Sequence, residues 1–221
     1  MPRGTFITFE GGEGSGKSTQ ARLLAGHLRA LNYDVVSTRE PGGTPFAEAV
    51  RHLILSDATP RHGATAEALL FFAARADHLA TLIRPALEAG RWVICDRFSD
   101  STRVYQGAAG TMPREAIEAL DRIVVGDTTP DLTLILDIEP AAGLARATER
   151  RGVSATPGTG VDPYEQRDLV FHQRLREGYL ELARAAAGRC IVIDAAGTQE
   201  EVAQRVREAV TNRLKLARRA G

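Results

Sequence analysis

The chain is poor in cysteine, and this shortage excludes two classes of protein. Its 221 residues include only Cys95 and Cys190, each within an apolar segment typical of a strand. Two separated cysteines form neither a disulfide framework nor a cysteine-based metal site. We therefore expect both to be small buried hydrophobic side chains in a reducing, cytoplasmic setting.

Excess charge and long apolar segments are missing as well. The 28 Lys and Arg residues balance the 28 Asp and Glu residues, so the formal net charge is zero. A broad basic surface for nucleic acid is not expected from this balance. No apolar run approaches the roughly 20 residues that cross a bilayer, and the first ten residues lack the apolar stretch of a signal peptide. We expect residues 1–221 to form a single domain without nucleic-acid or membrane partners.

Segments typical of strands alternate with segments typical of helices along the whole chain. The expected strands are 5–10, 34–38, 92–95, 132–137 and 190–194. The expected helices are 18–31, 46–55, 64–89 with a kink near Pro85, 114–125, 141–150, 166–187 and 199–216. This order predicts an α/β fold whose parallel sheet is covered by helices on both faces. Ligands of such sheets bind beyond the carboxyl ends of the strands.

A phosphate-binding sequence directly follows the first expected strand. GGEGSGKST matches the pattern G-x-x-x-x-G-K-[ST] at Gly11, Gly16, Lys17 and Ser18. Glycines let backbone N–H groups surround phosphate oxygens, and the next helix points its positive end at the same anion. Lys17, one of only two lysines, can reach the β- and γ-phosphates of ATP, while Ser18 can ligate Mg²⁺. The residues expected to bind ATP here are Gly11, Gly12, Glu13, Gly14, Ser15, Gly16, Lys17, Ser18 and Thr19.

This motif predicts nucleotide binding without defining the reaction. A GTPase would also carry an NKxD motif that reads the base, and the chain has none. Two alternatives stay open at this point: a kinase with a small acceptor, and a switch protein that binds ATP and a protein partner.

Arginines near strand ends favour the kinase. Transfer of a phosphoryl group needs cations for the acceptor phosphate and for the developing charge. Arg39 and Arg97 follow two expected strands, and Arg51 lies on the next helix. Asp96, at a strand end, is a candidate second ligand for Mg²⁺ and its waters.

Two further groups of side chains have alternative interpretations. Phe71 and Arg75 lie four residues apart on one helix face, where periodicity alone favours a core phenylalanine beside a solvated arginine. Arg146, Arg150 and Arg151 end an expected helix and enter residues 151–161, which are rich in Gly, Ser, Thr and Pro and are expected to form a mobile loop. These arginines either complement the helix dipole or belong to a closing lid at about residues 147–165.

Taken together, the motifs resemble those of the bacterial thymidylate kinases. The matching segments are FEGGEGSGKST, TREPGGTP, LLFFAARADH, DRFSDSTRVYQG, PDLTLILDI, DPYEQRD with the following helix ending in GYLELA, and IVIDA, in the family's order and over nearly the whole chain. The resemblance implies a P-loop nucleoside monophosphate kinase fold with a five-stranded sheet and a lid. It also implies Mg²⁺-dependent phosphorylation of dTMP to dTDP by ATP, in a homodimer. A kinase for another nucleoside monophosphate is the nearest alternative.

The resemblance also implies roles for individual residues. Arg39, Arg51 and Arg97 would hold the dTMP phosphate. Phe71 would stack on thymine, with Arg75 at its O4 edge and Thr102 near N3. The remaining residues expected near the acceptor are Glu10, Ser101, Tyr105 and Gln106 around the sugar, and Asp162 and Glu165 on the lid side. Glu10 or Glu13 would lie near the 3′-hydroxyl or the Mg²⁺ shell, and Arg146 beside adenine. Because Pro163 stands where many members have a lid arginine, Arg150 or Arg151 would join Lys17 and Arg97 in catalysis.

Overall fold

All five expected strands are present and form one parallel sheet. The computed structural model describes residues 3–55, 63–154 and 164–216. The strands are β1 (Phe6–Glu10), β2 (Val35–Arg39), β3 (Trp92–Asp96), β4 (Leu132–Asp137) and β5 (Cys190–Asp194), in the order β2-β3-β1-β4-β5. The central strand β1 is buried along its whole length. In the register of β1 and β3, Phe9 lies opposite Asp96, so the loops after these two strands leave the same edge of the sheet.

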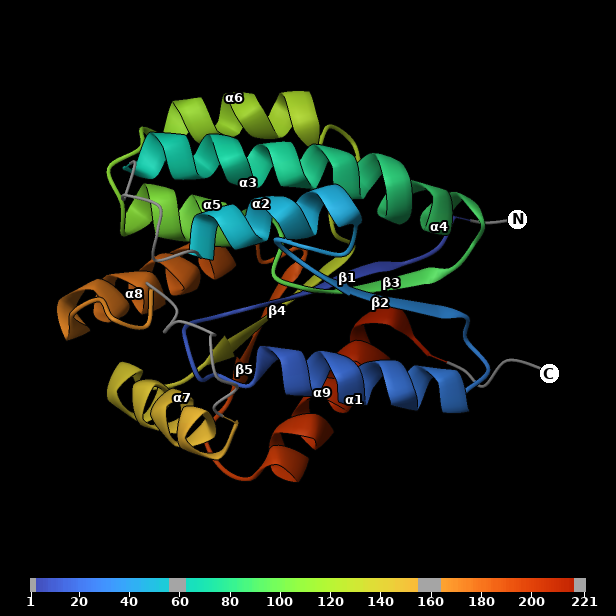
Figure 1. Ribbon diagram of the computed structural model, residues 1–221. Helices are drawn as coiled ribbons and strands as arrows, with labels where there is room; N and C mark the ends of the chain where they lie inside the picture. The colour runs from blue at the N-terminus through green and yellow to red at the C-terminus, as the bar shows by residue number, and fades with distance from the viewer. Residues whose placement is uncertain (1–2, 56–62, 155–163, 217–221) are drawn as a thin grey trace.

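Helices cover both faces of this sheet (Figure 1). On one face lie α1 (Lys17–Ala30) and α9 (Gln199–Leu214), which pack against each other and against the apolar side chains of the strands. The other face is covered by α2 (Pro45–Leu55), α3 (Ala64–His78), α4 (Arg84–Glu88), α6 (Arg114–Val124) and α8 (Leu169–Ala185). This arrangement confirms the α/β fold class predicted from the sequence.

The long helix expected at 64–89 is interrupted. After α3, the chain forms a π-helical segment η1 (Leu79–Ile83) before α4 begins. Pro85 lies at the start of α4 and has no N–H group to donate to the preceding turn. A wide π turn at this point accommodates the missing donor, so the expected irregularity precedes the proline.

Two other expectations about helices were incomplete. The segment Ser99–Ala108 has no helical apolar period, yet it forms a short helix α5 (Ser99–Thr102) and a π-helical segment η2 (Arg103–Ala108). The helix expected at 166–187 begins only at Leu169, because Asp168 caps it by accepting a hydrogen bond from the backbone N–H of Phe171 at 2.8 Å.

The expectation of a mobile loop at residues 151–161 is wrong for residues 151–154. Helix α7 (Pro140–Ser154) continues through Arg150 and Arg151 to Ser154. The composition of this segment, rich in Gly, Ser, Thr and Pro, favoured a loop, but a single glycine such as Gly152 costs a helix only about 1 kcal/mol and does not end it. Within the described ranges, no helix combines the length and apolarity needed to cross a membrane.

Candidate active site

The loop between β1 and α1 has the backbone that phosphate binding requires. Gly14 has a φ of +66°, and a Cβ atom there would lie 1.8 Å from the carbonyl oxygen of Gly143 on α7. Only glycine permits this contact, which locks the loop against α7. The ammonium of Lys17 donates to the carbonyl of Gly12 at 2.7 Å and lies 3.3 Å from the hydroxyl of Ser15. Burial, followed by the nearby charge of Arg97, lowers the pKa of Lys17 to about 8.

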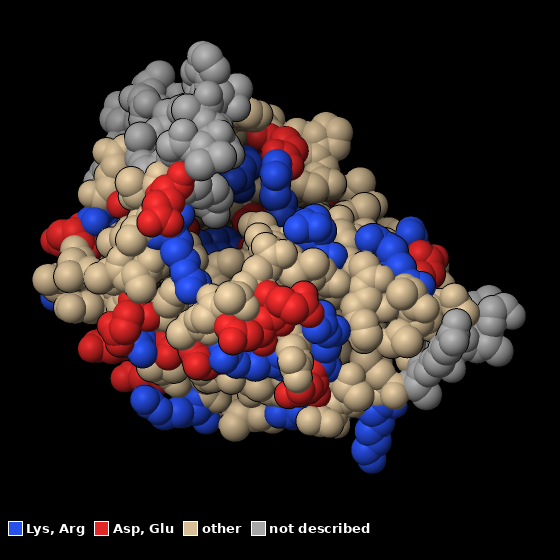
Figure 2. Space-filling view, turned by 90° about the horizontal axis from the view of Figure 1, so that it is seen from below, with Lys and Arg blue, Asp and Glu red and all other residues tan. Residues whose placement is uncertain are grey.

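A cavity of about 240 Å³ joins this loop to the ends of β2 and β3. Most residues predicted to bind the acceptor line it together with part of the phosphate-binding loop, although they lie far apart in the sequence. Those predicted residues that line the cavity are Glu13, Gly14, Gly16, Lys17, Ser18, Thr19, Arg39, Arg51, Phe71, Arg75, Asp96, Arg97, Ser101, Thr102, Tyr105, Gln106 and Glu165. Figure 2 shows basic side chains around a hollow, whereas acidic and basic side chains are interspersed over the rest of that face.

A second cavity, of about 260 Å³, lies on the other side of the phosphate-binding loop. Ser15 and Thr19 line it together with Arg146, which donates to the carbonyls of Ala195 and Gly197 at 3.0 and 3.1 Å. The structure thus places Arg146 beside the loop after β5, where the sequence resemblance predicts adenine. The two cavities meet at the phosphate-binding loop, as a donor site and an acceptor site would.

Some predicted residues are not found at these two cavities in the described part of the chain. Gly11 and Gly12, expected to bind ATP, line neither of them. Glu10 is fully buried and lines neither cavity. Arg150 and Arg151 lie on α7, and nothing is described of their side chains. Asp162 lies outside the described residues.

Arg97 is the most extensively bonded arginine of the acceptor cavity. It adopts a φ of +68°, which is rare for a residue with a side chain and turns it back over the phosphate-binding loop. Its Nη2 atom donates to Glu13 at 2.7 Å and to the hydroxyl of Tyr105 at 2.9 Å. Burial would raise the pKa of Glu13, but Arg97, then Lys17 and the Tyr105 hydroxyl, lower it to about 2. The site therefore holds Glu13 ionised and Arg97 fixed before any ligand binds.

Glu10 supports the site from beneath instead of lining it. One carboxylate oxygen accepts from the backbone N–H of Phe98 at 2.8 Å, and the other accepts from Ser101 at 2.6 Å and Tyr179 at 3.2 Å. Burial, followed by the charge of Asp100, raises the pKa of Glu10 to about 7. These bonds fix the start of α5, which follows Arg97 in the chain.

Arg75 is buried, so the interpretation that periodicity alone favoured, a solvated arginine, is wrong. Only 2% of its surface is exposed, and its Nη2 atom donates to Thr102 at 3.1 Å. Its Nε atom donates to Glu40 at 2.7 Å. Sequence reasoning missed Glu40, although the TREPGGTP segment that contains it was noticed. Phe71 lines the same cavity and is partly exposed to it.

The other two predicted phosphate ligands are held less firmly. Arg39 pairs with Glu48 at 3.1 Å and keeps 54% of its side chain exposed. Arg51 donates to the carbonyl of Pro41 at 3.1 Å. Both lie at the rim of the cavity, where a phosphate can reach them.

Tyr164 and Tyr179 were also missed, the first as a residue of the acceptor cavity and the second as a support beneath Arg97. Tyr164 lines the acceptor cavity and donates to Glu67 at 2.8 Å. The hydroxyl of Tyr179 lies 3.0 Å from that of Ser101, beneath Arg97. Tyr164 belongs to the DPYEQRD segment and Tyr179 to the GYLELA segment, and their place in these segments of the family resemblance was the available signal.

Asp96 is suited to a hydrated cation near the phosphates. It ends β3, lines the same cavity as Ser18, and one of its carboxylate oxygens is buried without a hydrogen-bond partner in the described part of the chain. A buried carboxylate oxygen requires compensation, and Mg²⁺ is commonly held by one or two carboxylates together with substrate phosphates.

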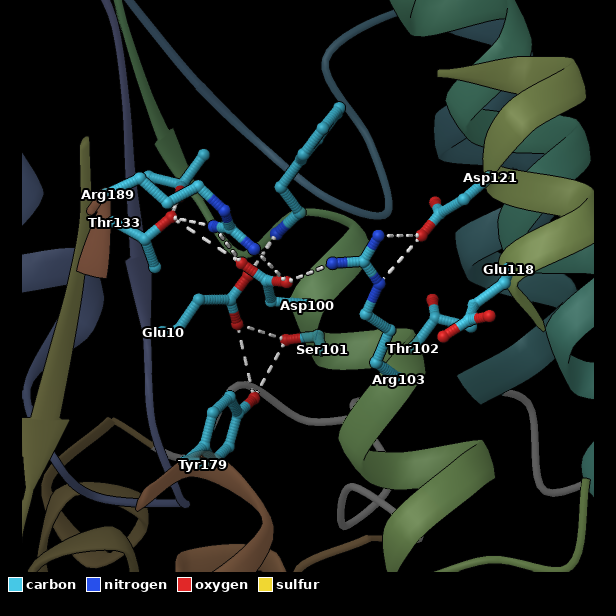
Figure 3. A network of polar contacts seen from close by, with 12 residues as sticks. Glu10, Asp100, Ser101, Thr102, Arg103, Glu118, Asp121, Thr133, Tyr179 and Arg189 are labelled. Carbon is cyan, nitrogen blue, oxygen red and sulfur yellow. Dashed lines mark hydrogen bonds and ion pairs between the residues drawn. The ribbon is translucent and has the colours of Figure 1, made fainter. Parts of the chain in front are cut away.

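A buried charge network lies behind α5 (Figure 3). Arg189, at the start of β5, forms two hydrogen bonds with Asp100 at 2.6 and 2.8 Å and one with Thr133 at 2.7 Å. Arg103 links the same Asp100, at 3.0 Å, to Asp121 on α6. The side chain of Asp100 is only 2% exposed. The network therefore ties α5, which carries Ser101 and Thr102, to the sheet.

Replacing Arg189 by methionine is expected to destabilise the fold. Asp100 would keep Arg103 but lose its bidentate partner, and breaking a buried ion pair costs about 3 kcal/mol. Urea unfolding should show this loss. The double variant Arg189→Met with Asp100→Asn should recover part of it, because no unpaired carboxylate stays buried. Equal stability of Arg189→Met and the parent protein would contradict this account.

The fold and the site define a class of protein. A P-loop at the centre of a parallel sheet, joined by one cavity to a set of arginines at neighbouring strand ends, is the arrangement of the P-loop nucleoside monophosphate kinases. The sequence model of the thymidylate kinase family matches residues 9–206. The chain belongs to the thymidylate kinase family.

Individual relatives agree with this assignment. The thymidylate kinase of Nitrobacter winogradskyi is 52% identical over 211 residues, which cover 96% of this chain and 90% of that protein. The thymidylate kinase of Afipia carboxidovorans is 52% identical over 212 residues, which cover 96% and 91%. The crystal structure of thymidylate kinase from Ehrlichia chaffeensis superposes with a TM-score of 0.75 at 33% identity, covering 95% of this chain and all of that one.

Proposed function

We propose that this protein transfers the γ-phosphoryl group of ATP to dTMP, giving dTDP and ADP. The observation that carries this proposal is the single cavity that connects Lys17 and Ser18 to the arginines at the ends of β2 and β3 and to the Phe71–Arg75–Thr102 pocket. A donor phosphate, an acceptor phosphate and a base each find complementary side chains along it.

The reaction depends mainly on positioning and on charge. The acceptor phosphate is already an anionic nucleophile, so no strong base is needed. Arg39, Arg51 and Arg97 hold it in line with the γ-phosphate of ATP. Lys17 neutralises charge on the transferred group, and Arg146 lies beside adenine in the second cavity. Arg150 or Arg151, at the end of α7 and within a lid at about residues 147–165 of this single-domain chain, completes the cationic set.

The residues present fit a magnesium ion. Ser18 and the partly buried carboxylate of Asp96 would hold it. Such an ion neutralises the phosphates of ATP and stabilises the charge that develops during transfer. Asp96 is fixed for this purpose by its place at the end of β3.

The acceptor cavity has a base pocket and a sugar pocket. Phe71 offers an aromatic face for the base, while Arg75 and Thr102 offer polar groups at its edge. Tyr105 lies against Glu13 and Arg97, where its ring restricts the space beside the sugar. Gln106, Ser101 and Glu165 complete this side of the cavity.

We also propose a homodimer formed through α2, α3 and α6, and a cytoplasmic location. Four large apolar side chains on these adjacent helices are exposed: Phe46, Leu53, Leu69 and Ile123, the last by 79%. Such a set is typical of an interface. Ile123→Glu should shift the protein to monomers in sedimentation equilibrium, whereas a monomeric parent protein would contradict the dimer. The two free, buried cysteines fit a reducing compartment.

The decisive experiment is an ADP-release assay with ATP and Mg²⁺ and each of dTMP, dUMP, dCMP, dGMP, dAMP and UMP as acceptor. Strong turnover with dTMP and little with the purine nucleotides is the expected result. Turnover with a different monophosphate would keep the kinase and overturn the base pocket. ADP release that ignores the acceptor would favour an ATP-dependent switch protein instead.

A further inference from the structure

We propose that Glu40 is a specificity-positioning residue: it holds Arg75 so that this arginine selects a carbonyl group, and rejects an amino group, at the 4-position of the pyrimidine. This inference rests on the proposed dTMP acceptor and deepens it. It concerns a residue that never donates to the substrate itself, because a carboxylate only accepts hydrogen bonds.

Arg75 is held in one plane by contacts on several sides. Glu40 accepts from its Nε atom at 2.7 Å, and Thr102 accepts from its Nη2 atom at 3.1 Å. The ring centroids of Phe72 and Phe98 lie 4.9 and 5.3 Å from its central carbon. Nη1 is buried and has no hydrogen-bond partner among the residues that the structure describes. Arg75 lines the acceptor cavity, so we assign this unpaired donor to the ligand.

Glu40 is itself held by a second, buried contact. Its other carboxylate oxygen lies 3.0 Å from Nδ1 of His78, whose Nε2 lies 2.7 Å from the hydroxyl of Thr38. The carboxylate can only accept, so Nδ1 carries the proton that faces it. The side chains of Glu40 and His78 are 5% and 0% exposed. The chain Thr38–His78–Glu40–Arg75 therefore joins β2 to the base pocket without passing through solvent.

The tight loop after β2 keeps this chain in place. Gly43 has a φ of +85°, and a Cβ atom there would lie 2.4 Å from the Thr38 hydroxyl and 2.6 Å from Nε2 of His78. The loop thus closes over the histidine, and the TREPGGTP segment has a physical role beyond its phosphate-binding Arg39.

A fixed guanidinium donor discriminates by chemistry. An N–H group bonds a carbonyl oxygen, but it meets another donor when the ligand carries an amino group. A buried donor left unpaired then lowers the rate with the wrong substrate. If Arg75 were free to turn, it would avoid the amino group and the discrimination would fall. Glu40 removes that freedom.

The test compares dTMP with 5-methyl-dCMP, which keeps the methyl group and replaces the 4-carbonyl by an amino group. Glu40→Gln changes little volume, but it replaces one of the two acceptor oxygens by an NH₂ group, which then faces the N–H donor of either Arg75 or His78. We expect the ratio of kcat/KM for the two acceptors to fall at least about tenfold in favour of 5-methyl-dCMP, with the KM for ATP unchanged. In an Arg75→Ala background, the same substitution should leave the ratio where Arg75→Ala alone puts it.

Glu48→Gln is the matched control. Glu48 pairs with Arg39 and caps Gly43, at the phosphate side of the same loop. Losing the carboxylate charge of Glu48 should change kcat/KM for both acceptors equally and leave the ratio of the two values unaltered. Should Glu40→Gln not fold, His78→Leu removes the donor to Glu40 and should lower the ratio, whereas His78→Asn retains a donor and should restore part of it.

The outcomes separate this inference from the proposed function. A folded Glu40→Gln enzyme with the parent ratio overturns the inference alone, provided the parent enzyme phosphorylates dTMP. Equal losses with both acceptors would also overturn it, because they would show a role in stability only. A parent enzyme without activity on dTMP would overturn both proposals.

Discussion

Replacing Lys17 by methionine is expected to lower turnover by on the order of 10³-fold or more, with no loss of stability. Lys17 is the only lysine of the cavity, and in the structure its ammonium lies inside the phosphate-binding loop on the carbonyl of Gly12. Methionine has a similar volume but no charge for the β- and γ-phosphates. A coupled assay of ADP release measures the loss.

The stability half of this prediction follows from the pKa of Lys17. Burial and Arg97 lower it from 10.5 to about 8 in the folded protein. At neutral pH, Lys17 is charged in both states, and burying that charge opposes folding. Between the two pKa values the unfolded chain binds more protons than the folded protein, so this cost diminishes as the pH rises through that window. The cost is about 3 kcal/mol at most. The methionine variant should therefore melt at the same temperature as the parent or higher.

The chain supplies its own control for Lys17. Lys215, its only other lysine, is exposed at the end of α9, far from the cavity. Lys215→Met makes the same chemical change there and should leave turnover unaltered. A folded and active Lys17→Met enzyme would refute the proposed mechanism, whereas equal losses in both variants would indicate a nonspecific effect.

The sequence predicted those parts of the site that depend on a contiguous motif or on the ends of strands. The phosphate-binding loop is a contiguous motif, Arg39 and Asp96 end two strands, and Arg97 follows the second of them. In a parallel sheet, strand ends are brought together by the topology alone. The sequence therefore predicted that these residues meet, without knowledge of any side-chain contact.

The parts that it missed depend on tertiary pairing. Periodicity alone favoured a solvated Arg75, because a helical period does not show which charged residue has a buried partner, and its partner Glu40 lies 35 residues earlier. Glu10 precedes the phosphate-binding loop, yet its carboxylate bonds Ser101 and Tyr179 from two other helices. The π-helical turns of Ser99–Ala108 produce no apolar period, so the segment that carries Thr102 and Tyr105 had no predicted structure.

Replacing Arg97 by lysine is expected to lower kcat/KM for dTMP by roughly 10²- to 10³-fold. Lysine keeps the positive charge that faces Glu13, and it also keeps a long side chain at the unusual φ of +68°. It cannot reproduce the planar fork, however, because a single ammonium cannot bond a phosphate bidentately while also reaching Glu13 and Tyr105. Steady-state kinetics with varied dTMP at saturating ATP measures the effect, and thermal unfolding checks the fold.

Arg39→Lys is the matched control for this substitution. Arg39 lines the same cavity, but more than half of its side chain is exposed and its partner Glu48 lies at the surface. Solvent screens a charge in that position, and a flexible ammonium can replace it at little cost. We expect a loss of less than about tenfold, mostly in the KM for dTMP. Similar losses of kcat/KM in the two variants would show that the summed charge of the arginines holds the acceptor phosphate. A much larger loss in Arg97→Lys would show that the fixed guanidinium of Arg97, beside the phosphate-binding loop, aligns the acceptor for attack.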